Sequence, residues 1–255
     1  MSARDPAAAP LPLSGVVVAR NEADRIGRCV RCLARVCAEV VVLDSGSDDD
    51  TVALARAAGA RVLHQDWLGY AAQKNAAIDQ ASQPWVLLLD ADEWLEPPAL
   101  AALRALFAGG RVESADVWRL LRRTHFLGHR LRAGSFAREP VERLFRAGFR
   151  HAPRAVHEYL DTAGARVATS DIAMEHDTAR SEAEYWRKLE GYARLWAAEQ
   201  RARGRRAWRG RGALAAAAYF LKNLVLRGGL VDGRGGWRFH RLHMRYAALK
   251  YRLLA

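Results

Sequence analysis

Short apolar runs alternate with helical patterns through the first half of the chain. The runs that are typical of buried strands occupy residues 15–19, 40–43, 61–64 and 85–89. Helical patterns separate them: a segment carrying three cysteines, a segment ending at Gly59, and residues 70–81. This alternation predicts an α/β fold with a parallel, doubly wound sheet and right-handed crossovers. The polar loops that follow the strands are then expected to collect at one edge of the sheet.

The run at 85–89 is expected to be the central strand, and it ends in Asp90-Ala91-Asp92-Glu93. Because side chains alternate along a strand, Asp90 and Asp92 should point the same way at its carboxyl end. Two like charges at this separation repel unless a cation lies between them, and carboxylate oxygens suit Mg²⁺ or Mn²⁺ better than structural zinc. A short motif also permits the alternative of a solvated acidic turn.

The pattern changes after a helix that begins at Pro97 and Pro98 and ends near Phe107. Short strand-like pieces follow without regular helices between them, at 116–121, 142–146, 155–160 and 172–174. They predict a mixed, partly antiparallel second half of the sheet. A capping-box sequence at 181–184 then begins a helix that reaches about Arg203.

The N-terminal residues and the cysteines indicate a reducing compartment. Residues 1–13 are rich in Ala and Pro and lack a basic stretch followed by a long apolar run, which predicts a disordered lead-in and a cytoplasmic protein. Cys29, Cys32 and Cys37 are the only cysteines, an odd count that does not favour a disulfide framework. They share one apolar helix face, which favours core packing over the zinc site that Cys-x-x-Cys could form.

The net charge of +12 is concentrated at the C-terminus. Residues 201–255 hold 14 Lys and Arg and one acid, Asp232, whereas the first 200 residues hold 26 basic and 27 acidic residues. Such a block is typical of a phosphate-bearing partner, either nucleic acid or an anionic membrane. Its two apolar segments, 213–226 and 237–254, are too short or too charged to be membrane-spanning helices. Their Trp and Tyr residues lie beside Arg and Lys, which favours helices that lie in the membrane interface. A charged helical appendage folded on the body is the alternative.

Four motifs in order resemble the inverting nucleotide-sugar glycosyltransferases of family 2, whose catalytic domain has the GT-A fold. They are Val-Val-Ala-Arg-Asn21-Glu22, Val-Val-Leu-Asp44-Ser-Gly-Ser, the segment His64 to Asn75 with its Gln73-Lys74, and Leu-Asp90-Ala-Asp92-Glu-Trp. Further motifs resemble bacterial lipopolysaccharide or lipooligosaccharide core β-1,4-glucosyltransferases: Phe126-Leu-Gly, Arg143-Leu-Phe-Arg146, Val156-His157-Glu158 and the basic aromatic tail. Residues 133–139 depart from that pattern, because an aromatic-rich stretch with an Asp is expected there.

The resemblance implies roles for individual residues. Asp44 would accept a hydrogen bond from uracil, with Asn21 and Glu22 near the same base and ribose, and Lys74 would approach the nucleotide. Asp90 and Asp92 resemble the family's metal and ribose pair, which holds Mg²⁺ or Mn²⁺ against the departing diphosphate.

Inversion also requires a carboxylate that takes the proton of the acceptor hydroxyl. Glu158, which lies in the shared Val-His-Glu segment, is the preferred base, with Asp177, Glu139 and Glu142 as the other candidates. His176 could be an additional metal ligand, because imidazole joins carboxylates readily on Mn²⁺-type ions.

The implied activity is transfer of a sugar, expected to be glucose, from a UDP-sugar to a heptose of a lipid-anchored core oligosaccharide. The enzyme would be peripheral on the cytoplasmic face of the inner membrane, with no nucleic-acid partner. The expected organisation is a lead-in over 1–13, a GT-A domain over 14–203 with a donor half at 14–110 and an acceptor half at 111–203, and a membrane-docking tail over 204–255.

Two other functions stay open at this point. A transferase with a polyprenyl-phosphate or other glycan acceptor would share the donor motifs, although it often carries clear spanning helices. A nucleic-acid-binding protein could use the basic aromatic tail, but acids gathered at the strand ends would repel a nucleic acid.

Overall fold

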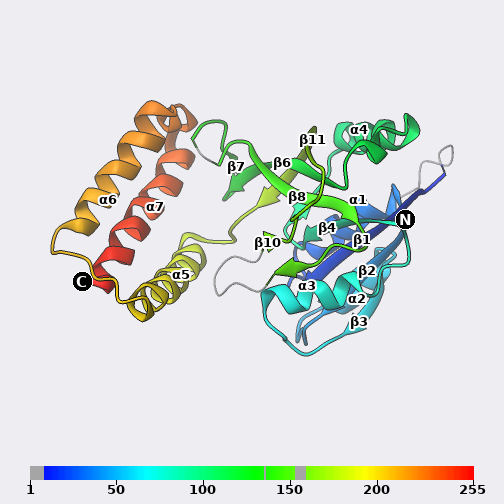
Figure 1. Ribbon diagram of the computed structural model, residues 1–255, viewed down its shortest axis with the longest axis horizontal. Coiled ribbons are helices and arrows are strands. Elements are labelled where there is room, and N and C mark those ends of the chain that lie inside the picture. Colours follow the sequence, from blue (N-terminus) through cyan, green and yellow to red (C-terminus); the bar gives the residue numbers. More distant parts are fainter. Residues whose placement is uncertain (1–8, 135, 153–158) are drawn as a thin grey trace. The chain divides into compact units, whose positions relative to one another are not determined.

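The computed structural model describes residues 9–134, 136–152 and 159–255, which form two compact units (Figure 1). The first unit contains residues up to 122 together with 140–176, and the second contains residues 123–139 and 177–255. The helix that follows residue 181 therefore groups with the basic tail. The domain boundaries at residues 110 and 203 stay predictions.

The first unit is built on a mixed sheet whose parallel part follows the predicted alternation. Its parallel strands lie in the order β3-β2-β1-β4. Their bounds are β1 (Leu11–Ala19), β2 (Cys37–Asp44), β3 (Arg61–His64) and β4 (Trp85–Asp90), with α1 (Ile26–Ala34), α2 (Thr51–Ala57) and α3 (Tyr70–Ile78) between them. One boundary was wrong: β1 begins at Leu11, so Leu11 to Leu13 belong to the sheet rather than to a disordered lead-in, because β1 pairs from Leu11 onward with β2.

The predicted mixed second half is also confirmed. The sheet continues from β4 in the order β8-β6-β11-β5, and both the β4–β8 and the β5–β11 pairs are antiparallel. Their bounds are β5 (Glu93–Trp94), β6 (Val117–Phe126), β8 (Glu139–Arg146) and β11 (Val167–Asp177), with the short β7 (His129–Arg130) beside β6. A separate ribbon pairs β9 (His151–Ala152) with β10 (Tyr159–Leu160). Most of the strand predicted at 155–160 lies outside the described residues.

Both faces of the parallel strands are covered, which explains their uninterrupted apolar runs. Val17 and Leu87 belong to a cluster with α1 and α4 (Pro97–Ala108), whereas Val16 and Leu88 belong to a second cluster with α3. Adjacent residues of one strand therefore pack into different hydrophobic clusters, one on each face of the sheet. This layering confirms the predicted α/β class.

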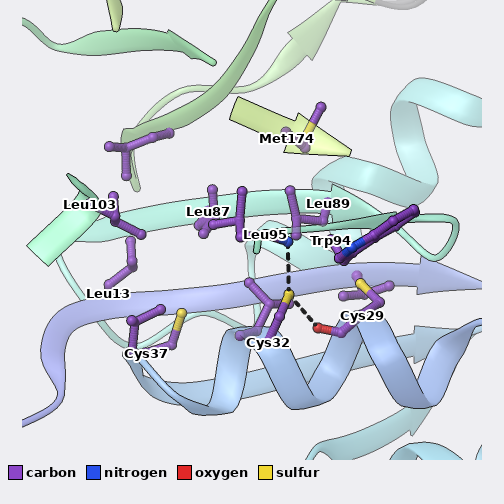
Figure 2. Close-up of a cluster of buried hydrophobic side chains, with 14 of the residues drawn as sticks. Leu13, Cys29, Cys32, Cys37, Leu87, Leu89, Trp94, Leu95, Leu103 and Met174 are labelled. Carbon is purple, nitrogen blue, oxygen red and sulfur yellow. Dashed lines mark hydrogen bonds between the residues drawn. The ribbon is translucent and has the colours of Figure 1, made fainter. Parts of the chain in front are cut away.

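The three cysteines lie in the first of these clusters (Figure 2), as the helix-face pattern predicted. Cys32 Sγ contacts the Cys29 carbonyl oxygen at 3.0 Å and accepts from Leu95 N at 3.3 Å. Burial raises the pKa of Cys32 to about 11 and those of Cys29 and Cys37 well above their ordinary values. These thiols therefore act as small apolar groups of the core.

The second unit is helical, apart from the strand ends it contains. Its elements are α5 (Glu182–Ala202), α6 (Arg211–Phe220), the π-helix η2 (Leu221–Leu226), the 3₁₀ turn η3 (Gly229–Asp232) and α7 (Gly233–Leu254). Ser181 caps α5 by accepting from Glu184 N at 3.1 Å, which confirms the predicted start of this helix. In the described part of the chain no single helix is long and apolar enough to cross a membrane, while 211–226 and 229–254, bent by 79°, pass that test only as a pair.

Two histidines are buried where α7 meets the rest of this unit. Tyr185 Oη lies 2.8 Å from His243 Nε2, and Tyr219 Oη lies 2.8 Å from His240 Nδ1. Burial, and then the neighbouring His240 and Lys250, lower the pKa of His243 to about 3. Burial also lowers the pKa of His240. The helical unit is therefore built around neutral imidazoles.

We expect the second unit to lose stability in mild acid. The pKa of His243 is about 6.5 in an unfolded chain and about 3 in the folded unit, so the unfolded state binds the proton more readily between these values. The stabilising contribution is complete above about pH 6.5 and falls by up to ~1.4 kcal/mol for each pH unit below it. Amide hydrogen exchange of α5 and α7, corrected for intrinsic rates, measures this loss.

The control is the double variant His243→Phe with Tyr185→Phe, which removes both partners of one hydrogen bond. Its helical unit should show a shallower loss of protection with falling pH, and only the contribution of His240 should persist. An unchanged slope would assign the acid sensitivity to other groups.

Candidate active site

The candidate site lies where the parallel strands of the first unit end. The register places Asp44 of β2 beside Ala19 of β1, and Asp90 of β4 beside Val18 of β1. The loops after β1, β2 and β4 therefore leave the sheet at one edge. The structure confirms that these polar loops lie at the same edge of the sheet, as predicted.

Asp44 is buried and organises the loop after β2. Its Oδ2 accepts from Gly46 N and Ser47 N, both at 2.9 Å, and its Oδ1 accepts from Ser47 Oγ at 2.5 Å. A carboxylate offers about four acceptor positions, so three hydrogen bonds leave one direction for a donor outside the loop. The glycine at 46 has a φ of 84°, which favours the residue that lacks a Cβ.

The loop after β1 is tied to the loop after β2 by hydrogen bonds from its backbone. Asn21 N donates to Ser47 Oγ at 2.9 Å, Asn21 Oδ1 accepts from Asp48 N at 3.0 Å, and Glu22 N donates to Thr51 Oγ1 at 2.7 Å. Asn21 has a φ of 56°, a left-handed conformation that Asn tolerates better than most residues. The structure thus brings Asn21, Glu22 and Asp44 together.

Asp90 is held between two cations at the end of β4. Lys74 Nζ lies 3.0 Å from Asp90 Oδ1, and Arg143 donates from Nη2 to Asp90 Oδ2 at 2.6 Å. The same Arg143 nitrogen donates to Glu93 Oε1 at 2.7 Å, and Glu93 Oε2 accepts from Asp90 N at 3.0 Å. Arg122 approaches Glu93 at 3.9 Å. We call Lys74, Asp90, Glu93 and Arg143 the charge network.

The charge network fixes the protonation of Asp90 and Arg143. Burial alone would raise the pKa of the Asp90 carboxyl, but Arg143 and then Lys74 outweigh it and hold that pKa well below its ordinary value. Burial would likewise lower the pKa of Arg143, and the facing Asp90 and Glu93 raise it instead. Asp90 therefore stays ionised throughout the neutral and mildly acidic range.

Asp92 lies in a second group, with Arg25 and His176. Asp92 Oδ2 is 3.4 Å from His176 Nε2 and 3.7 Å from Arg25 Nη1. His176 is opposite Glu93 in the β5–β11 pair, which brings the imidazole to the end of β4. Its Nδ1 is buried without a hydrogen-bond partner in the described structure.

These two groups differ in how well they fit a divalent ion. Both oxygens of Asp90 contact protein cations, so an ion bound there has to share or displace Lys74 or Arg143. Asp92 and His176 offer carboxylate and imidazole donors that face each other, a set that Mn²⁺-type ions accept. Among the described residues no group of three or more His, Cys, Asp or Glu forms a metal site. An ion held by Asp92 and His176 would thus take its other ligands from substrate phosphates and water.

The four carboxylates predicted as candidates for the catalytic base lie in different parts of the chain. Glu158 lies outside the described residues, between β9 and β10. Asp177 and Glu139 belong to the second unit. Glu142 is in the first unit, where it accepts from Arg119 Nε at 2.7 Å.

The segment that carries Glu158 starts from a firmly held strand. Asn75 of α3 donates from Nδ2 to the His151 carbonyl oxygen at 2.9 Å and accepts from His151 N at 2.7 Å. Both polar groups of the His151 backbone are thereby bound to the helix that also carries Lys74.

Sequence reasoning identified Lys74 but missed the other charged residues beside Asp90 and Asp92. Arg25 and Glu93 are buried next to residues it had identified, and the Asp-Ala-Asp-Glu run was the signal for Glu93. Arg143 was noted within Arg-Leu-Phe-Arg without a role. Its partners are 53 and 50 residues away in the chain, so only the sheet order reveals the contact.

We expect Arg143→Met to destabilise the protein strongly. The change leaves Glu93 buried with less positive charge nearby, and removing one partner of a buried ion pair costs about 3–5 kcal/mol. Denaturant unfolding of the full chain measures the loss of free energy. Arg166→Met, which removes an exposed partner of Asp116, is the matched control and should leave the midpoint almost unchanged.

The second variant Arg143→Met with Glu93→Gln should regain part of that loss, because it removes the uncompensated acid. If Arg143→Met unfolds at the midpoint of the unaltered protein, the charge network does not stabilise the fold.

Residues 14–157, more than half of the chain, match the family described as Glycosyl transferase family 2. The lipopolysaccharide core biosynthesis glycosyltransferase LpsC of Rhizobium meliloti (strain 1021) is 41% identical over 126 residues, which cover 47% of this chain and 45% of LpsC. The succinoglycan biosynthesis protein ExoU of the same organism is 40% identical over 105 residues, covering 38% of this chain and 31% of ExoU. The chain thus spans less than half the length of these curated relatives.

Among solved structures, S. aureus TarS 1-349 in complex with UDP-GlcNAc superposes with a TM-score of 0.49 at 14% identity, covering 95% of this chain and 92% of that one. The family match covers the candidate-site residues from Asn21 to Arg143 but not His176 of β11, and it confirms the family 2 resemblance seen in the motifs. The chain therefore belongs to glycosyl transferase family 2, and its mixed α/β sheet agrees with the fold class that the motifs predicted.

Proposed function

We propose that this glycosyltransferase moves a sugar, with inversion, from a UDP-sugar to a lipid-linked core oligosaccharide of lipopolysaccharide. The observation that carries the proposal is the set of cations around Asp90 and Asp92 at the carboxyl edge of the parallel strands. Such an edge is where open α/β sheets bind their ligands. Membership of glycosyl transferase family 2 supports transfer of a sugar as the reaction at this edge.

The cations suit the leaving diphosphate. Lys74, Arg143 and Arg25 are all buried near the end of β4, and all three contact the carboxylates there. Fixed positive charges in a partly dry site stabilise negative charge that develops as the bond to the diphosphate breaks. The carboxylates hold these cations in place before substrate arrives.

The nucleoside is assigned to the loops after β1 and β2. The Asp44 carboxylate accepts three hydrogen bonds within its own loop, and its remaining acceptor position suits the N–H of a uracil ring. Asn21 and Glu22 are held against that loop, near the positions expected for the base and ribose. The donor sugar is proposed to be glucose on the basis of the resemblance to core glucosyltransferases.

Mg²⁺ or Mn²⁺ completes the proposed site, with Asp92 and His176 as its protein ligands. A bound divalent ion would offset charge on the diphosphate. Asp90 is assigned to the charge network and, as the resemblance implies, to the ribose, rather than to the metal alone. His176 can serve as a ligand because Nε2 already faces the Asp92 carboxylate.

The proton of the acceptor is assigned to Glu158. In a direct displacement the acceptor oxygen forms a bond to the anomeric carbon, and its proton passes to Glu158. The bond from that carbon to the diphosphate oxygen breaks, and its electron pair leaves with UDP. Ala155, Val156, Tyr159 and Leu160 flank Glu158 in the sequence, an apolar setting that suits a proton acceptor.

The acceptor class is supported by the relative named for lipopolysaccharide core biosynthesis. A membrane-anchored acceptor, expected to be a heptose-bearing core, also suits the basic tail, which would hold the enzyme peripherally on the cytoplasmic face of an anionic inner membrane. A second candidate is another glycan acceptor, including a polyprenyl-phosphate-linked one, since ExoU is named for succinoglycan biosynthesis. Binding of nucleic acid is not proposed.

We expect Asp92→Asn to abolish metal-dependent binding of UDP while the fold is retained. The amide lacks the charge that a divalent ion requires, whereas the contacts of Asp92 with Arg25 at 3.7 Å and His176 at 3.4 Å are long. Calorimetric titration with UDP and Mn²⁺ measures the effect, and Asp116→Asn is the control. Unchanged affinity in Asp92→Asn would remove this residue from the metal site.

We expect Glu158→Gln to retain binding of UDP and to lose transfer by roughly 10² to 10⁴-fold, the usual contribution of a positioned base. Turnover of UDP-glucose on a defined heptose-bearing acceptor measures it. Asp177→Asn and Glu139→Gln are tested in parallel. Near-normal turnover in Glu158→Gln, with loss in one of the others, would move the role to that residue.

A further inference from the structure

One face of the segment formed by α6 and η2 is apolar and faces away from the rest of the second unit. Its exposed positions recur in pairs four residues apart, as one side of a helix does: Ala213 and Leu214, Ala217 and Ala218, Leu221 and Lys222, Val225 and Leu226. Leu226 is 74% exposed and Leu221 is 52% exposed. The opposite side packs along α7, the neighbouring helix in Figure 1. We call these eight positions the α6 stripe.

The α6 stripe exposes apolar residues where a helix that faces water exposes polar ones. A surface helix normally turns its polar residues outward and its apolar residues toward the core. Here Lys222 is the one charged residue among the eight positions. The α-helical part of the stripe, residues 213–220, runs for about 10 Å along the helix at 1.5 Å per residue, and η2 extends it further.

The turn that follows extends the apolar surface. Leu230 is 55% exposed, Val231 77% and Trp237 44%, all within η3 and the first turns of α7. Phe220, at the end of α6, is 38% exposed. Large apolar side chains exposed over successive elements in this way are typical of an interaction site.

The charge around this surface restricts its partner. Residues 201–255 hold 14 Lys and Arg against one acid, and that acid, Asp232, accepts from Arg132 N at 2.8 Å and Ala133 N at 3.1 Å. Arg238 and Arg241 are bound to Glu182 of α5. Lys222 and Arg234 are both exposed, the first in the stripe and the second just after the turn.

We propose that the α6 stripe, together with Leu230 and Val231, lies in the plane of an anionic bilayer with its apolar side chains among the upper acyl chains. An apolar helix face, basic residues at its margins and an exposed Trp are what such interfacial helices combine. A second copy of the chain would bring an equally basic surface against this one, which like-charge repulsion opposes. This inference rests on the proposed lipid-linked acceptor, and it names the surface that inserts rather than a general attraction of the tail.

The test uses the full chain with vesicles of phosphatidylcholine, alone or mixed with phosphatidylglycerol. The variant Leu226→Glu with Val231→Glu changes the two most exposed apolar positions, so its fold should be retained. We expect its partitioning to anionic vesicles to fall by roughly tenfold or more, because two apolar insertions are lost and two acids are added. Leu195→Glu, at a 48% exposed position of α5, is the matched control and should partition as the unaltered protein does.

A site-specific probe measures insertion directly. The native cysteines are buried, so a single cysteine placed at 226 can be labelled with an environment-sensitive fluorophore, and one at 195 provides the control. We expect a blue shift on vesicle binding at 226 that persists at high salt, and none at 195. No shift at 226 while the protein binds, or full release by high salt, would mean attraction by charge alone and would overturn the proposal.

Sedimentation velocity and calorimetry distinguish membrane insertion from dimerisation and from failure of the proposed function. A concentration-dependent dimer in sedimentation velocity that the double Glu variant abolishes would assign the stripe to a second copy and overturn the proposal. Calorimetric binding of UDP with Mn²⁺ should be equal in the double variant and the unaltered protein. Failure of insertion with normal UDP binding rejects only this inference, whereas absence of UDP binding in both proteins rejects the proposed function.

Discussion

The structure of the candidate site depends on keeping Asp90 ionised at the end of a buried strand. Asp90 and Glu93 are within reach of one guanidinium, Arg143, and Lys74 approaches Asp90 from the other side. Without these cations, burial would drive the Asp90 carboxyl toward the neutral form. The sheet order serves this requirement, because β8 pairs with β4 and thereby brings Arg143 to Asp90.

The parallel half of the fold was predictable because its signals are local. Apolar runs, capping residues and glycines mark each strand and helix, and the carboxyl-edge rule then brings Asp44 and Asp90 together. The start of β1 was misjudged because Ala and Pro enrichment continues up to a strand that Leu11 begins. Composition is a poor guide within a few residues of a boundary.

The partners of the carboxylates could not be predicted in the same way. Arg25 is the N-cap residue of α1 and Arg143 lies in a strand of the second half, and in the sequence each is one of many arginines. What distinguishes them is burial beside acids that are distant in the chain. The helices of the tail were predictable, but the side of α6 that packs on α7 was not, because residues 213–221 carry no charged residue on any side of the helix.

The double hydrogen bond between Asn75 and His151 has a mechanical consequence. Lys74 and Asn75 are successive residues of α3, one bound to the end of β4 and the other to the backbone of β9. Two successive residues of one helix therefore join the charge network to β9, so the positions of Asp90 and of the His151 backbone are both set by α3.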